Sequence, residues 1–392
     1  MKGMEELTDT QAVPPPVVGI GASAGGLEAI SQLIRGLDPA LPYAYVVLQH
    51  VSPTHRSMLP EILARETQLS VRPLKDGDAP EAGVIHVVPP NVNAFIREGR
   101  FTLLPAKPEV VPKPSVNDFF ISLAADASDE AIGIVLSGTG SDGTAGLRTI
   151  MAAGGVTLAQ DPLTAKYSGM PHSAIEAGVA DFVLPPESMP AKLAELARMH
   201  TQARNSAGDQ VPEQLLEKLK GRRQIDFSGY KTGTLSRRLR RRMVATGSQT
   251  PEDYLSLVEQ HPDELDVLAR DILISVTAFF RDRDAFDALR PQVASICKRC
   301  REDGQDIRVW VAGCATGEEA YSIAMMFAET LRNDPEAPSV QIFATDIDED
   351  ALAVARRGLY PAAALQTVPE ALLQRYFMPY SSTYEAASGY AT

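Results

Sequence analysis

Residues 17–26 read Val17-Val-Gly-Ile-Gly-Ala-Ser23-Ala-Gly-Gly26, a short apolar run that leads into a serine among glycines. The residues that follow, with Leu27, Ile30 and Ile34 at helical spacing, are typical of an amphipathic helix. A strand that turns sharply into a helix is typical of a parallel α/β sheet. A serine at such a turn can stand above the sheet, beside backbone N–H groups and the helix N-terminus. The stretch therefore indicates both a fold class and a position for a nucleophile.

Short β-branched runs alternate with helical patterns as far as residue 184, which predicts parallel strands joined by crossover helices. The proline-rich stretch Pro105–Pro114 can be neither a central strand nor a helix, so a loop is expected there. The fold class is thus α/β with a doubly wound parallel sheet. The expected strands are Val17–Ile20, Ala44–Gln49, Val84–Val88, Ile132–Leu136, Val156–Ala159 and Phe182–Leu184.

The composition and the hydrophobic pattern of the sequence change along the chain, and these changes predict its division into domains. Residues 1–16 are expected to be a disordered N-terminus, residues 17–197 the α/β domain and residues 198–211, small and polar, a linker. Residues 212–300 are predicted to form a small all-α subdomain. Residues 301–392 return to strand and helix alternation, with strands Ile307–Ala312 and Val340–Thr345, and are predicted to form a partial Rossmann-like domain.

Composition excludes several classes of protein. The chain of 392 residues is 44% hydrophobic and carries a net charge of −13, so packed cores are expected and the molecule as a whole should be repelled by nucleic acid and by anionic membranes. Three cysteines are too few for a disulfide scaffold. No apolar run of about 18 residues and no signal peptide are visible. We therefore expect a cytoplasmic protein that is not embedded in a membrane.

Two further residues accompany Ser23 at the carboxyl ends of predicted strands. His50 follows Ala44–Gln49 and Asp142 follows Ile132–Leu136, so all three are expected on the edge where open parallel sheets bind ligands. Serine, histidine and aspartate can act as nucleophile, general base and orienting carboxylate in acyl transfer. Taken singly, His50 and Asp142 read more readily as a strand terminator and a turn residue, and only together do they favour catalysis.

The glycines at the first turn also permit a dinucleotide-binding interpretation. Gly19, Gly21 and Ala24 fit the loose pattern G-x-G-x-x-G/A, which would indicate a nucleotide-dependent oxidoreductase. That interpretation expects an acidic residue after the second strand to bind a ribose. His50 stands there instead, and this disfavours the oxidoreductase.

Four segments together resemble the catalytic domain of the chemotaxis receptor methylesterases (CheB-type). The resemblance covers about residues 17–196 and implies hydrolysis of glutamate methyl esters, often with deamidation of glutamine, through Ser23, His50 and Asp142. It also implies oxyanion donation by the backbone N–H groups near Ala24 and Thr139, with no cofactor. The family's receiver domain is expected to be absent from this chain. The segments are Gly19–Gly26, Gln49–His50, Leu136–Gly143 and Tyr167–Pro171.

Three other segments resemble the chemotaxis receptor methyltransferases (CheR-type), over about residues 212–376. They are residues 275–281, Gly313–Glu319 and residues 344–348. The resemblance implies an S-adenosylmethionine site with contacts from Thr277, Arg281, Glu318 and Asp346. Ser275 stands where the family commonly has Asn. After Met378 the sequence is expected to leave the family pattern, so the methyltransferase half is predicted to be truncated and the chain to hydrolyse esters without methylating.

Residues 217–242 carry ten Lys or Arg against two acidic residues, an excess of eight positive charges in an acidic chain. Leu235, Leu239 and Met243 recur every four positions and predict one apolar helix face. The segment aligns with the basic helical subdomain of the methyltransferase family, which implies docking of an acidic receptor helix; nucleic-acid binding is disfavoured because interleaved aromatics are missing. The predicted docking residues are Arg237, Arg238, Arg240, Arg241 and Arg242.

Cys297 and Cys300 have C-x-x-C spacing, but no second pair or nearby histidine completes a zinc site, so a turn of helix is expected and no metal is predicted. The leading hypothesis is a methylesterase that acts on methyl-accepting chemotaxis-type receptors, joined to an incomplete methyltransferase module. The alternative is a regulatory receptor-binding protein whose methyltransferase half is not catalytic.

Overall fold

The structure is a computed structural model that describes residues 14–50, 58–105, 114–205, 211–273, 277–365, 367–380 and 383–386. The chain divides into two compact units, residues 1–268 and 269–392, and each is described by itself. The predicted disorder of residues 1–13 and most of the predicted loop before Pro114 lie outside the described residues.

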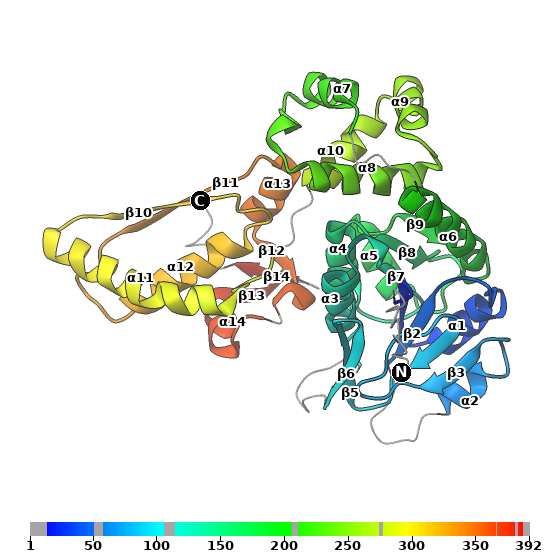
Figure 1. Ribbon diagram of the computed structural model, residues 1–392. Coiled ribbons are helices and arrows are strands. Elements are labelled where there is room, and N and C mark those ends of the chain that lie inside the picture. The colour runs from blue at the N-terminus through cyan, green and yellow to red at the C-terminus, as the bar shows by residue number, and fades with distance from the viewer. Residues whose placement is uncertain are drawn as a thin grey trace, which may run out of the picture. The chain divides into compact units, whose positions relative to one another are not determined.

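A parallel sheet with the strand order β3-β4-β2-β1-β7-β8-β9 forms the centre of the first unit (Figure 1). The doubly wound α/β fold and all six predicted strands are confirmed. The sequence missed β3, a partly exposed edge strand that ends in Pro73 and lacks a long β-branched run. The strands are β1 (Val17–Ala22), β2 (Ala44–Gln49), β3 (Ser70–Pro73), β4 (Val84–Val87), β7 (Ile132–Val135), β8 (Val156–Gln160) and β9 (Phe182–Leu184).

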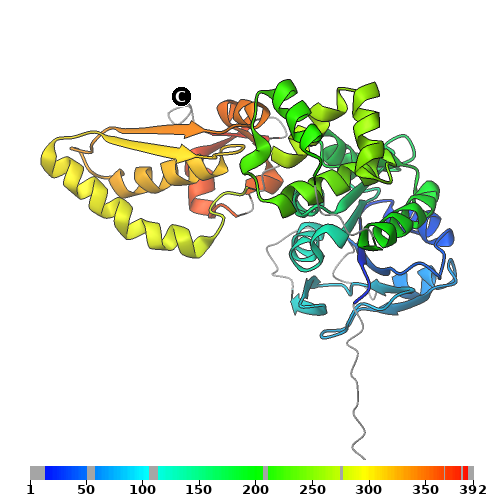
Figure 2. The same cartoon turned by 45° about the horizontal axis from the view of Figure 1, so that its top comes forward.

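Helices cover both faces of this sheet. One face carries α1 (Gly26–Arg35), α2 (Leu59–Leu63) and α6 (Met189–Asn205), and α1 and α6 lie side by side in Figure 2. The other face carries α3 (Val116–Ala127), α4 (Thr144–Ala153) and α5 (Gly169–Glu176). An antiparallel hairpin, β5 (Val92–Arg97) and β6 (Arg100–Pro105), packs on α3 and was not predicted. Short 3-10 turns η1 (Ser128–Glu130) and η2 (Pro186–Ser188) precede β7 and α6.

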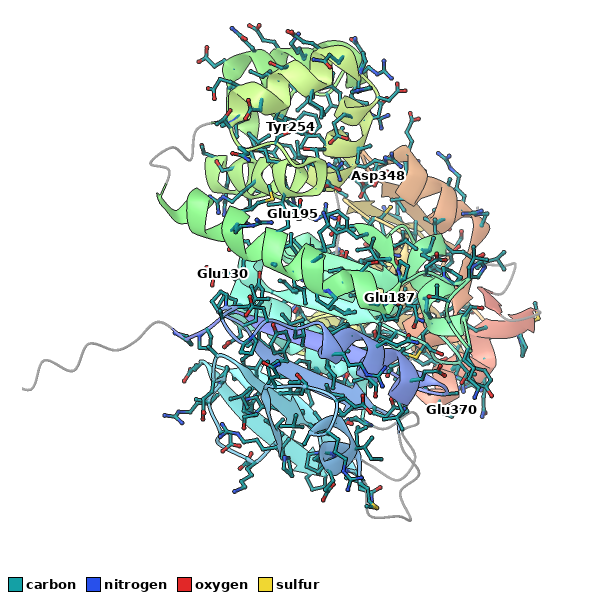
Figure 3. The ribbon with its side chains drawn as sticks, turned by 90° about the vertical axis from the view of Figure 1, so that its right-hand side faces the viewer. Glu130, Glu187, Glu195, Tyr254, Asp348 and Glu370 are labelled. Atoms are coloured by element: carbon teal, nitrogen blue, oxygen red, sulfur yellow. The ribbon has the colours of Figure 1, made fainter. Side chains whose placement is uncertain are left out.

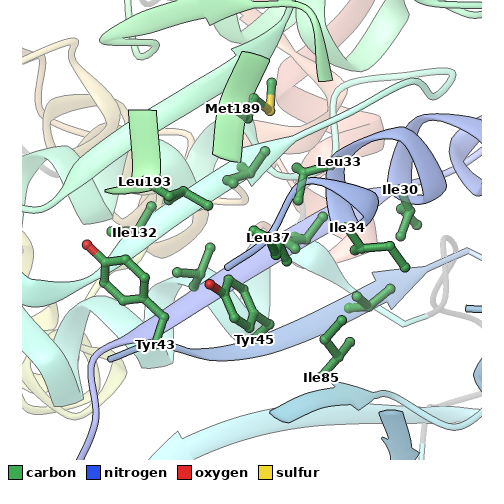
Figure 4. Close-up of a cluster of buried hydrophobic side chains, with 14 of the residues drawn as sticks. Ile30, Leu33, Ile34, Leu37, Tyr43, Tyr45, Ile85, Ile132, Met189 and Leu193 are labelled. Atoms are coloured by element: carbon green, nitrogen blue, oxygen red, sulfur yellow. The ribbon is translucent and has the colours of Figure 1, made fainter. Parts of the chain in front are cut away.

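The core beneath α1 and α6 is apolar and fully buried (Figure 4). Ile30, Leu33 and Ile34 of α1 meet Leu193 of α6 and Tyr45 of β2 there. Burying such side chains contributes about 1.5–3 kcal/mol each to folding. This packing fixes the ends of β1 and β2, from which two of the predicted catalytic residues project.

The glycines of β1 are required by the helix on the opposite face. A Cβ atom added at Gly19 would lie 2.7 Å from the ring of Phe120, and one at Gly21 would collide with Val116, both on α3. Close approach of α3 to the strand therefore accounts for these glycines without a bound dinucleotide, which removes the main support for the oxidoreductase interpretation.

Helices follow the sheet domain within the first unit, as predicted. They are α7 (Glu213–Arg223), η3 (Phe227–Gly229), α8 (Thr232–Thr246), α9 (Pro251–Gln260) and α10 (Glu264–Leu273), whose last residues belong to the second unit. Tyr254, labelled in Figure 3, is fully buried in this helical subdomain and donates a hydrogen bond of 2.8 Å to Glu264. The predicted linker is shorter than expected, because α6 continues to Asn205 through residues such as Gln202 and Arg204 that favour helix.

The second unit begins with α11 (Arg283–Asp303) and the parallel pair β10 (Ile307–Ala312) and β11 (Val340–Thr345), connected by α12 (Glu318–Leu331). Both strands lie where the sequence predicted them, and the C-x-x-C pair lies within α11. The remaining elements are α13 (Glu349–Arg357), β12 (Leu359–Pro361), η4 (Ala362–Leu365), α14 (Glu370–Tyr376), β13 (Phe377–Tyr380) and β14 (Thr383–Ala386). β12, β14 and β13 form an antiparallel sheet that the sequence did not predict.

One face of the β10–β11 pair is covered and the other is open. Val309 and Val311 contact α12 residues, whereas Trp310 is 71% exposed and Phe343 43% exposed. Among the helices of the described residues, none combines the length and apolar character needed to cross a lipid bilayer.

Candidate functional site

Three neighbouring strands of the sheet bring Ser23, His50 and Asp142 to one edge. Ser23 directly follows β1, and its N–H donates to the carbonyl of Ser137, after β7, over 2.9 Å. On the other side of β1, the side chain of Gln49 donates to the carbonyl of Ser23 over 2.6 Å, and the N–H of His50 donates to Ala22 over 2.9 Å. These bonds hold the serine turn between the ends of β2 and β7, as the strand positions predicted.

His50 and Asp142 form a hydrogen bond. Nε2 of His50 lies 2.9 Å from Oδ2 of Asp142, and their side chains are only 10% and 6% exposed. A carboxylate in this position fixes the imidazole tautomer and stabilises the ring when it gains a proton. The structure therefore places two of the three predicted catalytic residues in hydrogen-bonding contact. Such a contact between histidine and carboxylate is what the predicted reaction requires.

Asp142 is held by the N-terminus of α3, a contact that the sequence did not predict. The N–H of Val116 donates to Oδ2 over 2.8 Å, and the N–H groups of Asn117 and Gly143 donate to Oδ1 over 3.0 Å each. Backbone donors at a helix N-terminus favour a negative charge. Asp142 is therefore fixed in place and electrostatically stabilised by the helix that packs against β1.

Asn117 adds a second link between α3 and the Asp142 loop. Its Oδ1 atom accepts from the N–H groups of Gly143, over 3.0 Å, and Gly146, over 2.9 Å, and the residue is 4% exposed. Ser115, the N-cap of α3, could have signalled where the helix begins, because its side chain accepts from Asp118 as a capping serine does. No local pattern could have signalled the contact with Asp142.

Ser23 is partly exposed, and within the described residues its hydroxyl is not hydrogen-bonded to His50. Because Nε2 of His50 faces Asp142, Nδ1 is the ring nitrogen that remains to act on Ser23. Catalytic hydrogen bonds are often long in the absence of substrate and tighten when it binds. Residues 51–57, which follow His50, lie outside the described residues.

The predicted oxyanion donors are Ala24, which follows Ser23 in the same turn, and Thr139, in the loop after β7. Within the described part of the chain, the N–H groups of Ala24 and Thr139 donate to no protein acceptor. Gly138, the residue before Thr139, approaches Ser23 so closely that a Cβ atom there would lie 2.8 Å from the serine Cβ and collide with the sulfur of Met170. Free backbone donors beside a nucleophile are the arrangement that stabilises a tetrahedral oxyanion.

The second unit holds a separate cluster of predicted contacts at the carboxyl ends of β10 and β11. Gly313 and Gly317 adopt φ of +72° and +98°, and a Cβ atom at Gly313 would meet nothing within 4 Å. Asp346, after β11, accepts from the N–H of Ala315 over 2.7 Å and from that of Asp348 over 2.9 Å. Glu318 opens α12, is 7% exposed and accepts from the hydroxyl of Thr316 over 2.6 Å. This is an open glycine turn at a helix start with carboxylates beside it.

Thr277 and Arg281 flank a buried aromatic pair in the same unit. Phe279 is fully buried and Phe280, at φ +51°, donates its N–H to the hydroxyl of Ser322 on α12 over 3.0 Å. Arg281 is exposed. The segment is thus attached to the helix that begins at Glu318. Ser275 lies outside the described residues.

The five predicted docking arginines lie on α8, but two of them are not available to a partner. Arg238 is 6% exposed and Arg241 is 3% exposed, and both contact the sheet domain of the same unit. Arg242 binds Glu264 over 2.7 Å within the helical subdomain. Among the five, Arg237 is the exposed one. The helix was predicted correctly, and two of the five arginines proposed for a receptor, Arg238 and Arg241, face the sheet domain of the same unit.

Three family models match successive parts of the chain. Residues 18–193 match the model described as CheB methylesterase, and residues 213–273 match the all-alpha domain of CheR methyltransferase. Residues 275–388 match the SAM binding domain of CheR methyltransferase. The last match extends ten residues beyond Met378, so the expectation that the sequence leaves the family pattern there was wrong.

Several proteins are similar to long stretches of the chain. A Rhodobacter capsulatus protein named "Uncharacterized 104.1 kDa protein in hypE 3'region" is 33% identical over 350 residues, which are 82% of this chain and 37% of that protein. The Anaeromyxobacter dehalogenans "Protein-glutamate methylesterase/protein-glutamine glutaminase 2" is 38% identical over 201 residues, 50% of this chain and 59% of that protein. The chain thus spans well under two thirds of the length of these relatives. The crystal structure of the Thermotoga maritima CheB methylesterase catalytic domain is 31% identical, with a TM-score of 0.44 over 47% of this chain and 100% of that one.

Proposed function

Because the chain carries a CheB methylesterase domain followed by the two domains of a CheR methyltransferase, we propose that it hydrolyses glutamate methyl esters on chemotaxis-type receptors. The observation that carries this proposal is the bond of 2.9 Å between His50 and Asp142, beside Ser23 at one sheet edge. The names of the methylesterase relatives support the same reaction.

The proposed mechanism uses only side chains and backbone groups of this domain. Ser23 Oγ attacks the ester carbonyl while Nδ1 of His50 takes its proton, and Asp142 stabilises the resulting imidazolium. The N–H groups of Ala24 and Thr139 donate to the oxyanion. The tetrahedral intermediate collapses as His50 returns the proton to the methoxy group, which leaves as methanol. Water activated by His50 then hydrolyses the acyl-enzyme and regenerates Ser23. A glutamine side chain would follow the same course and release ammonia, so deamidation is proposed as the second activity.

The test of this function is release of methanol from receptor methylated at glutamate. The protein should release methanol catalytically, and Ser23→Ala should reduce release to background while the variant keeps the circular dichroism spectrum and melting temperature of the original. Catalytic release by a folded Ser23→Ala variant would refute the nucleophile. Receptor binding without any methanol release by the unsubstituted protein would instead favour the regulatory binding protein.

We also propose that the CheR SAM binding domain takes S-adenosylmethionine at the carboxyl ends of β10 and β11. The open turn at Gly313 fits close approach of a ligand to the backbone, and Asp346 after β11 is positioned for ribose hydroxyls. When bound, the cofactor supplies an activated methyl group. Thr277, Arg281 and Glu318 are the proposed further contacts, and Glu318 and Asp346 would orient the ligand through hydrogen bonds.

Calorimetric titration tests this site independently of the esterase. Asp346→Asn keeps the side-chain size but weakens acceptance from Ala315 and from a ribose, so binding of S-adenosylmethionine should weaken at least tenfold, on the order of one lost charged hydrogen bond. The matched control is Asp334→Asn, which changes a carboxylate that pairs with Arg301. This variant should bind S-adenosylmethionine with the original affinity. Equal affinity in both variants would refute the role of Asp346.

The proposed partners are methyl-accepting chemotaxis-type receptors, and the proposed location is the cytoplasm. Nucleic acid is not a proposed partner, since the strongest basic segment, α8, is largely engaged within the protein.

A further inference from the structure

The basic helix α8 makes its strongest contact with a buried carboxylate of the sheet domain. Arg241 forms an ion pair with Asp181, which directly precedes β9, and the two side chains are 1% and 3% exposed. Buried charges are stable only when paired and hydrogen-bonded, because each is costly to remove from water. This pair therefore requires α8 to stay in place.

Asp181 is prepared for this partner by β8. Its Oδ2 atom accepts from the N–H of Thr157 over 2.9 Å and from the hydroxyl of Thr157 over 2.8 Å, while its own N–H donates to the carbonyl of Thr157 over 3.0 Å. One carboxylate oxygen is thus fixed to the sheet, and the other, Oδ1, receives Arg241. The sheet domain thus forms the binding site for a guanidinium group, and Arg241 of α8 occupies it.

Arg238, one turn of helix away, binds the C-terminus of α4. Its guanidinium donates to the carbonyl groups of Met151 and Ala152 in the last turn of α4, where a helix lacks the N–H donors of a following turn. A cation at this end also interacts favourably with the helix dipole. Arg240 adds a bond of 2.8 Å to Asp129 in η1, with both side chains about one-third exposed.

Apolar packing extends the same contact. Val244 of α8 is 5% exposed and belongs to the core cluster that contains Leu193 and Leu196 of α6 and Tyr43. The contact is therefore continuous with the methylesterase core, with the buried ion pair of Arg241 and Asp181 beside it.

The contact lies on the edge of the sheet opposite the catalytic residues. Asp129 precedes β7, the C-terminus of α4 precedes β8, and Asp181 precedes β9. Ser23, His50 and Asp142 follow the carboxyl ends of β1, β2 and β7. Because these strands are parallel, the amino and carboxyl ends lie at opposite edges of the sheet. Figure 1 shows α8 near α4 and β9 on this side.

We propose that α8 is an internal clamp that binds the helical subdomain to the amino edge of the methylesterase sheet, through Arg238 and Arg241. The partner that this basic surface fits is the Asp181 carboxylate and the α4 carbonyl groups of the same chain, and the surface does not dock receptor while the clamp is closed. The helical subdomain and the methylesterase then fold and move as one body, whose catalytic edge stays open. The clamp does not depend on the proposed reaction.

The test uses the full chain with a protease recognition sequence in place of residues 206–210. After cleavage, the two pieces should elute together in gel filtration, since the clamp holds them without the linker. In Arg238→Ala/Arg241→Ala the dissociation constant of the pieces should rise at least a hundredfold, which is the order expected when a buried charge loses its partner. Arg237→Ala, an exposed arginine of the same helix, is the matched control and should co-elute. Separation of the unsubstituted pieces, or co-elution of the double variant with unchanged affinity, would overturn the clamp.

A second measurement separates the ion pair from a general loss of folding. Melting temperatures of Arg241→Ala, Asp181→Ala and the variant with both changes are compared in the uncut chain. If the two side chains are paired, the double variant should melt no lower than the worse single variant, because it leaves no lone buried charge. Additive losses would show that Arg241 and Asp181 act separately and would contradict the proposal.

Discussion

Nε2 of His50 is hydrogen-bonded to Oδ2 of Asp142 over 2.9 Å, although 92 residues separate them in the sequence. The bond places the ring proton on Nε2 and the free lone pair on Nδ1, since each nitrogen of a neutral imidazole has one role. Asp142 in turn accepts from three backbone N–H groups, two of them at the start of α3. The N-terminus of α3 thus supports the carboxylate that sets the tautomer of His50.

Asp142→Asn should lower kcat by about 10⁴ with little change in KM, the scale seen when a triad loses its orienting carboxylate. The amide removes the charge that stabilises the imidazolium and can present N–H groups to His50, which favours the wrong tautomer. Methanol release measured against receptor concentration checks this. Asp118→Asn, on the first turn of α3 and bonded to Asn93, serves as the control. A kcat within tenfold of the original would remove Asp142 from the mechanism.

Asn117 should act as a positioning residue for Asp142. Asn117→Asp keeps an acceptor for Gly143 and Gly146 but adds a negative charge beside Asp142, so protonated His50 is stabilised and the acid limb of the kcat/KM profile should move to higher pH. Asn93→Ala, which instead breaks the bond to Ser115 of α3, should reduce stability without moving that limb. A profile that is identical in Asn117→Asp would mean that Asn117 has only a structural role.

Gly21→Ala should inactivate the enzyme through α3. The added methyl group collides with Val116, the residue whose N–H holds Asp142. Combining it with Val116→Ala removes the obstructing side chain and should recover much of the lost melting temperature and activity. If instead the glycine served a bound nucleotide, the second substitution would rescue nothing.

Acid should destabilise the first unit through His86. Its side chain is fully buried on β4 against Phe101, and neither ring nitrogen has a partner among the described residues. Burial first and the charge of Arg72 second lower its pKa to about 4, although Asp78 and Glu81 act in the opposite direction. The unfolded chain binds this proton near the ordinary pKa of about 6.5, so the native state binds fewer protons between those values. The contribution of neutral His86 to the free energy of unfolding is therefore fully present above pH 6.5, and it is lost as the pH falls towards 4.

Urea unfolding between pH 4 and 7 measures this loss. His86→Leu should show a shallower fall of unfolding free energy with acid than the original protein. His172→Leu, whose ring is 60% exposed and pairs with Glu176, should keep the original slope. Parallel curves for the original and His86→Leu would exclude the buried histidine as the cause.

The sheet was predictable because its signals are local. The β-branched runs of β1, β2 and β7 end at Ser23, His50 and the Asp142 loop, so the carboxyl-edge rule alone places three reactive residues together. The support for Asp142 was not predictable, because Val116 and Asn117 are 26 and 25 residues away and contribute backbone groups that any sequence possesses. Likewise β3 lacks a run of β-branched residues, and its pairing with β4 provides its structure.

The pattern of charges in the sequence did not predict the partners of the arginines of α8. An excess of positive charge on a helix ordinarily indicates a solvated face, and the helix itself was predicted correctly. The partners Asp181 and Asp129 lie 60 and 111 residues earlier and look like ordinary turn residues. Only the packed structure reveals that a basic helix and two isolated acidic residues are complementary.

The exposed Trp310 allows the second unit to be followed by its own fluorescence. It is the sole tryptophan of the 392 residues, and its indole N–H donates to the hydroxyl of Thr345 over 3.0 Å, immediately before Asp346. Indole fluorescence of the unmodified protein therefore originates wholly in the second unit, while the first unit contributes tyrosine emission without an indole signal. Emission spectra can thus follow ligand binding or melting in the second unit while the proposed esterase activity of the first unit is assayed in the same sample.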